Sequence, residues 1–172
     1  AHYFRPSGYH TALAGKIHFL GPDQHHGFET RLTPDLYPAD FSWVPNWGEE
    51  GKRDTNDSRS VTIAGICERS VQIDFDNLVT YHAIQHLFDL ARSRDDRPFF
   101  MQVSYTHPHE PYLPKEQHDA HSVRLLSDFE MLNVRFSDKD IQRARRAYYG
   151  SISYLDVPCR SNDYCAISLH RA

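Results

Sequence analysis

The chain has 172 residues, 40% of them hydrophobic and 24% charged, which is typical of a globular protein with a buried core. A formal net charge of −4 argues against a general attraction to nucleic acid. No apolar run approaches the roughly 18 residues of a membrane span, and we expect neither a nucleic-acid nor a membrane partner. Twelve histidines suggest metal or proton chemistry.

In chain order, residues 9–20 are expected to be extended, with an interruption at Gly15. Residues 21–62 are rich in Pro, Asp, Gly and aromatic residues and show no sustained period. This predicts a loop, and a loop of that length in a compact domain is usually functional or disordered. Its aromatic residues favour a functional loop.

A helix is predicted over Asp74–Arg92, because apolar residues recur every four positions: Val79, Ala83, Leu87 and Ala91. The apolar, aromatic-rich segment 99–105 is typical of a buried strand. Ser137 to Asp140 matches a capping box, and an apolar stripe follows it to Leu155. We expect this last helix to end at Pro158. Alternating helices and strands predict an α/β fold.

Lys16 and His18 stand two residues apart near the predicted end of the first strand. Alternate residues of a strand share a face, so both side chains are expected to project to one side. An ammonium beside an imidazole suits a group with several anionic oxygens. The alternative is an ordinary solvated strand end.

His107 and His109 follow the next predicted strand, around Pro108. Pro108 favours extended geometry at His107, so the two imidazoles are expected to share a side. A structural turn with surface histidines is the alternative. A metal site is not favoured, because no Cys or carboxylate completes a ligand set at zinc-finger spacing.

Other candidate motifs give weaker evidence of a functional role. His82 and His86 have helical i, i+4 spacing but lack H-E-x-x-H, so ordinary helix-surface histidines are expected. The cysteines form no C-x-x-C pair and are expected to be incidental thiols: Cys67, Cys159 and Cys165. Trp43 lies in the long loop, where an indole can cover a substrate or hold a quaternary ammonium by cation–π attraction.

Four segments resemble the sulfatases, in order along residues 1–156: "GKIHFLGPDQ", "YPADFSW", "THPHEPY" and "RRAYYGSISY". They are similar to the branch that hydrolyses choline sulfate. The resemblance implies part of an alkaline-phosphatase-like α/β sandwich with a central mixed sheet flanked by helices. It also implies hydrolysis of a sulfate ester, with choline sulfate as the small-molecule partner, a cytoplasmic bacterial location and a homo-oligomeric parent.

By this resemblance, Lys16 and His18 contact the sulfate and the nucleophile, and His107 lies on the sulfate and protonates the leaving oxygen. Trp43 lines the choline pocket, and His109 is a neighbour. The family uses formylglycine, made from Cys or Ser in C-x-P-S-R, and a divalent cation, usually calcium. Neither C-x-P-S-R nor the metal-binding Asp pair occurs here, so we expect this chain alone to be inactive.

Residues 157–172 depart from the family pattern and are expected to be an aberrant tail, from a frameshift or truncation. Alternative functions remain open. One is a non-catalytic module that binds an anion or choline. Another is a related phosphodiester or phosphonate hydrolase, and a third is a histidine-rich metal-binding protein.

Overall fold

The computed structural model describes residues 1–37, 59–118 and 136–169, with side chains described up to residue 160. The chain divides into two compact units. The first consists of Ala1–Trp43, Val71–Thr106 and Pro158–Ala172, and the second of Val44–Ser70 and His107–Val157. Each unit has a small hydrophobic core of its own.

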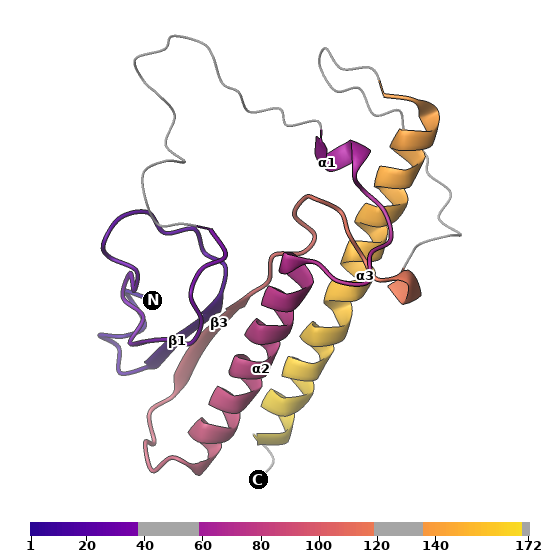
Figure 1. Ribbon diagram of the computed structural model, residues 1–172. Helices are drawn as coiled ribbons and strands as arrows, with labels where there is room; N and C mark the ends of the chain where they lie inside the picture. The colour runs from indigo at the N-terminus through magenta and orange to yellow at the C-terminus, as the bar shows by residue number, and fades with distance from the viewer. Residues whose placement is uncertain (38–58, 119–135, 170–172) are drawn as a thin grey trace, which may run out of the picture. The chain divides into compact units, whose positions relative to one another are not determined.

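The first unit contains a parallel sheet in the order β2-β1-β3. Figure 1 shows two of its strands, β1 and β3, side by side. Its strands are β1 (His10–Gly15), β2 (Thr30–Arg31) and β3 (Phe99–Ser104). The five residues of β1 after His10 are buried, as expected for a central strand, whereas β3 at the edge is half-buried throughout. The predicted strand over 99–105 is confirmed, ending one residue earlier, but the expectation that it is buried is wrong, because among the described strands it pairs with β1 alone.

Helix α2 (Val71–Arg92) packs against β1 and β3. The core of this unit joins Ala14 of β1 to three apolar residues of α2, spaced by about one turn: Phe75, Val79 and Ala83. Partly buried side chains pack against this core: Leu32 and Leu36 after β2, Met101 and Val103 of β3, and Tyr105 directly after β3. The predicted helix is confirmed, although it begins three residues earlier, directly after Ser70, a residue type favoured at the N-cap.

Gly15 terminates β1 at a point where no other residue fits. Its φ is +106°, and a Cβ placed there would lie 1.8 Å from the carbonyl oxygen of Ser104. The backbone N–H of Gly15 donates to Thr33 Oγ1 at 2.8 Å, and Lys16 N–H donates to the Ser104 carbonyl at 2.9 Å. The predicted interruption at Gly15 is therefore confirmed, and the chain after it is no longer strand.

The second unit is built around most of helix α3 (Asp138–Leu169), with the short helices α1 (Arg59–Thr62) and η2 (Glu116–His118). Its core joins Ala64 to Ala144 and Ala147 of α3. The predicted capping box is confirmed: Ser137 Oγ donates to Asp140 Oδ2 at 2.6 Å, and Asp140 N–H donates back to Ser137 Oγ at 3.2 Å.

The prediction that the last helix ends at Pro158 is wrong, since α3 continues through it to Leu169. A proline inside a helix removes one N–H donor and disturbs the carbonyl four residues earlier, at a cost of about 3 kcal/mol. This cost is local, and the helix continues beyond the proline to Leu169. Pro158 also marks the residue at which α3 passes from one unit to the other.

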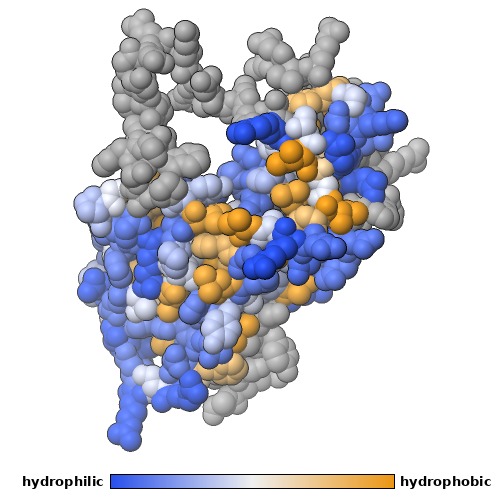
Figure 2. Space-filling view, viewed as in Figure 1, coloured by the Kyte–Doolittle hydropathy of each residue, from blue (hydrophilic) through white to orange (hydrophobic). Residues whose placement is uncertain are grey.

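Large apolar side chains remain at the surface of both units, and orange residues interrupt the blue surface in Figure 2. On α2 they occupy the side opposite the buried stripe: Leu78, Tyr81 and Phe88, with 39%, 59% and 45% exposure. Among the described residues, no helix combines the length and apolarity needed to cross a bilayer.

Candidate functional site

Lys16 and His18 lie in the first unit, immediately beyond the carboxyl end of β1. The sequence predicts that the alternation of a strand directs both side chains to one face. That reason is wrong, because β1 ends at Gly15 and His18 has a φ of +62°. Left-handed backbone costs a non-glycine residue about 1–2 kcal/mol and needs support from its surroundings.

Asp35 supplies that support. Its Oδ2 accepts hydrogen bonds from the backbone N–H groups of Ile17 and His18, at 3.1 and 2.7 Å. Its Oδ1 accepts the N–H of Leu36 at 2.8 Å. Arg31 approaches Oδ2 at 3.4 Å, and the Asp35 side chain is only 5% exposed. One nearly buried carboxylate therefore fixes the backbone that carries both candidate residues.

Tyr37 brings the two candidate side chains together. The Nζ of Lys16 lies 4.6 Å from the centre of the Tyr37 ring, which is within the range of a cation–π contact. The His18 ring centre lies 5.4 Å from that of Tyr37. His18 is exposed and Lys16 half-buried, so an ammonium and an imidazole meet solvent beside one aromatic ring. This arrangement is chemically suited to an oxyanion.

His107 belongs to the second unit and is 2% exposed. Its ring packs at 4.8 Å, centre to centre, on Tyr154 of α3, and His118 contacts the same tyrosine at 5.6 Å. Thr106, the preceding residue, donates its N–H to the fully buried Asp76 of α2 at 2.6 Å. Within the first unit, a buried carboxylate therefore holds the backbone N–H of Thr106.

His109 does not share the environment of His107, so that expectation is wrong. It is exposed, with Nδ1 2.9 Å from the Glu110 carbonyl oxygen and 3.4 Å from a Glu110 carboxylate oxygen. The reason is that β3 has ended at Ser104, and residues 107–110 form turns in which the alternation of a strand does not apply. Trp43, the predicted choline contact, lies outside the described residues.

The described residues do not fit the cation or the nucleophile that the resemblance implies. Within those ranges, no three His, Cys, Asp or Glu side chains are placed to share a metal ion. Burial raises the pKa of the Cys67 thiol, and its Sγ donates to the Leu113 carbonyl oxygen at 3.0 Å, so it is a poor nucleophile.

Sequence reasoning missed Asp35, Tyr37 and Asp76. A weak signal existed for Asp35, because an Asp directly after a proline commonly accepts backbone N–H groups in a turn. Tyr37 and Asp76 carried no comparable signal, since their partners, Lys16 and Thr106, are distant in the sequence.

Comparison with known proteins gives a consistent result. A model of the sulfatase family matches residues 1–158. A choline-sulfatase of Rhizobium meliloti is 41% identical, over 91% of this chain and 36% of that protein. An iduronate 2-sulfatase of Mus musculus is 27% identical over 90% and 34%, and an arylsulfatase of Clostridium perfringens is 26% identical over 89% and 39%. The chain spans about a third of the length of these relatives.

Proposed function

This chain belongs to the sulfatase family, and on that premise we propose that it forms one part of an enzyme that hydrolyses sulfate esters. The observation that carries the proposal is the identity of 41% to a choline-sulfatase over nearly the whole chain. We propose choline sulfate as the substrate. The arrangement of Lys16 and His18 beside Tyr37 supports an anionic substrate group.

The proposed hydrolysis breaks the bond between sulfur and the ester oxygen, adds the elements of water and releases an alcohol and hydrogen sulfate. Lys16 places a positive charge against the sulfate oxygens, and the His18 imidazole donates a hydrogen bond to them. Such contacts accelerate the reaction to the extent that they strengthen as charge moves in the transition state.

His107 is proposed to supply the proton that the leaving alkoxide requires. General acid catalysis of this kind typically contributes about 10²–10⁴-fold. The contact with Tyr154 limits the rotation of the His107 ring, which favours a constant direction of proton transfer. His109 is proposed as a neighbour of substrate, and Trp43 as the aromatic contact for the choline ammonium.

The sulfatase family is generally dependent on a metal ion and on formylglycine, and calcium is the ion that we propose for the complete enzyme. Since the described residues supply no three-ligand metal group, and burial raises the pKa of the Cys67 thiol, we assign no catalytic step to either group here. The same observation favours a second function for the chain by itself, which is binding of a sulfate ester without turnover.

A chimera tests the proposed function. Residues 1–156 would replace the matching segment of the Rhizobium meliloti choline-sulfatase, with choline sulfate, an aryl sulfate and a phosphodiester as substrates. We expect preferential hydrolysis of choline sulfate and a loss of about 100-fold or more with Lys16→Met. A folded chimera that cleaves only the phosphodiester would contradict the assignment to sulfate esters.

Calorimetry on the chain itself tests the second function. Heat of binding with millimolar choline sulfate, reduced in Lys16→Met and unaccompanied by turnover, is the expected result for a binding module. Unchanged heat in Lys16→Met would place any binding elsewhere.

A further inference from the structure

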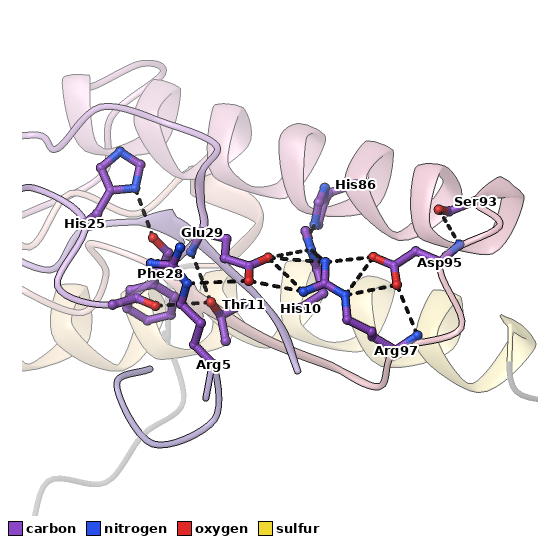
Figure 3. Close-up of polar contacts among 11 residues, drawn as sticks. Arg5, His10, Thr11, His25, Phe28, Glu29, His86, Ser93, Asp95 and Arg97 are labelled. Atoms are coloured by element: carbon purple, nitrogen blue, oxygen red, sulfur yellow. Dashed lines mark hydrogen bonds and ion pairs between the residues drawn. The ribbon is translucent and has the colours of Figure 1, made fainter. Parts of the chain in front are cut away.

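Two histidines distant in the sequence face each other in the first unit. His10 begins β1 and His86 lies on α2, and their Nε2 atoms share a hydrogen bond of 3.2 Å, whose proton a metal ion bound to both atoms would replace (Figure 3). The ring centres are 5.2 Å apart at an interplanar angle of 31°. Both side chains are partly buried. Neither is required by the proposed hydrolysis.

We propose that the His10–His86 pair binds a divalent transition-metal ion of the zinc or nickel class, through both Nε2 atoms. With zinc–nitrogen bonds of about 2.0–2.1 Å, nitrogens 3.2 Å apart subtend an angle of about 100° at the ion, close to tetrahedral. In the described ranges no group of three ligating side chains converges, so water completes the coordination. This makes the site an exchangeable one.

The other nitrogen of His10 has the partner that a metal-bound imidazole needs. Its Nδ1 lies 3.3 Å from Oε2 of Glu29 (Figure 3). When Nδ1–H donates to this carboxylate, the Nε2 lone pair is available to a metal, and the ring is held in one orientation. Arg97 Nη2 lies 3.4 Å from the same Nδ1, but it lies closer to Asp95 Oδ2, at 2.7 Å, and Arg97 Nη1 lies 3.1 Å from Oε1 of Glu29.

His86 presents its Nε2 to His10 from α2. Burial, and after it the neighbouring His10, lowers the pKa of its ring, against an opposing effect of Asp89. Neutral imidazole is the ligating form, and each proton bound at low pH competes with the metal.

The surrounding charges balance. Glu29, Asp95 and Asp89 are matched by three arginines that pair with them: Arg5, Arg97 and Arg92. A cation therefore enters a region without net repulsion. Because the ion bonds to both β1 and α2, it stabilises the packing of the helix on the sheet.

Thermal unfolding of a purified protein that contains all of residues 1–172 tests the site, with ZnCl₂ or NiCl₂ added at pH 7.5 after treatment with a chelator. We expect the metal ion to raise the Tm by at least about 2 °C. His86→Gln and His10→Gln should each weaken binding by at least roughly tenfold, since either change removes half of a two-ligand site.

His82→Gln is the matched control, because His82 is one turn earlier on the same helix and should leave the shift intact. A loss in His82→Gln equal to that in His86→Gln would overturn the proposal. So would an unchanged shift in His86→Gln, or a folded wild-type protein whose Tm does not respond to either metal.

An NMR titration of the wild-type protein tests the site without relying on variants that could misfold. In ¹⁵N-labelled wild-type protein, Zn²⁺ should move the Nε2 resonances of two histidines together at the same metal concentration, and these should assign to His10 and His86. Selective change at any other pair of histidines would overturn the proposal.

Discussion

The carboxylate of Asp35 accepts the backbone N–H of His18 at 2.7 Å, and this bond holds His18 in a left-handed conformation. The same carboxylate oxygen accepts the N–H of Ile17. Through these two hydrogen bonds, Asp35 fixes the backbone of Ile17 and His18 directly after β1.

Asp35→Ala should destabilise the protein by about 2–3 kcal/mol, because several backbone N–H groups lose a charged acceptor. Binding of choline sulfate should weaken more than this loss of stability explains, since Lys16 and His18 lose their fixed backbone. Urea denaturation and calorimetry measure the two effects. Asp23→Ala is the control: Asp23 also accepts backbone N–H groups, from His25 and His26, but in an exposed turn. Equal losses of binding in the two variants would contradict a special role for Asp35.

Gly15→Ala should be strongly destabilising, by about 3 kcal/mol or more, because the new Cβ meets the Ser104 carbonyl oxygen and φ is positive. Gly8→Ala is the matched comparison, since Gly8 also has positive φ but an added Cβ meets nothing within 4 Å. That variant should lose only about 1 kcal/mol. Denaturant midpoints measure both, and similar losses would show that backbone conformation alone sets the cost.

Stability should fall as pH decreases below about 6.5. The folded-state pKa of His86 is lowered, first by burial and then by His10, so the unfolded chain binds the proton more readily. The contribution is complete above the unfolded value and is lost as pH falls through the folded one. Urea midpoints at pH 7.5 and 5.5, with a chelator present, should differ less in His86→Gln than in wild type. His118, whose pKa burial also lowers, acts in the same direction and is present in both proteins. An identical pH dependence in both would refute this assignment.

Tyr154→Ala should destabilise the second unit by about 3 kcal/mol, because the ring is 7% exposed and packs on His107. Tyr154→Phe keeps the ring and should retain most of the stability. Tyr149→Ala, at a position 43% exposed on the same helix, is the control and should have little effect. The chemical shifts of the His107 ring report the contact directly, and they should change in Tyr154→Ala but not in Tyr149→Ala.

The exposed apolar side of α2 should limit the solubility of the chain by itself. Replacement of Leu78, Tyr81 and Phe88 by Glu should raise the soluble yield while leaving the helix content unchanged, because these side chains are not in the core. The measurement is soluble yield together with circular dichroism. No gain in solubility would locate the aggregation-prone surface elsewhere.

Local sequence patterns predict individual helices of this fold. The four-residue period from Val79 to Ala91 predicted α2, and the capping box at Ser137 predicted the start of α3. The end of α3 was predicted wrongly, because the rule that proline stops a helix describes a local cost that the rest of a helix can outweigh.

The sequence by itself determined the family, the α/β class and the identity of the candidate residues, since each depends on neighbouring residues or on order along the chain. Only the tertiary structure decided what those residues touch. Tyr37 lies beside Lys16 and His18, Asp76 holds Thr106, and His86 faces His10 across 76 residues. Such contacts depend on how strands and helices pack, and they cannot be predicted from local sequence spacing.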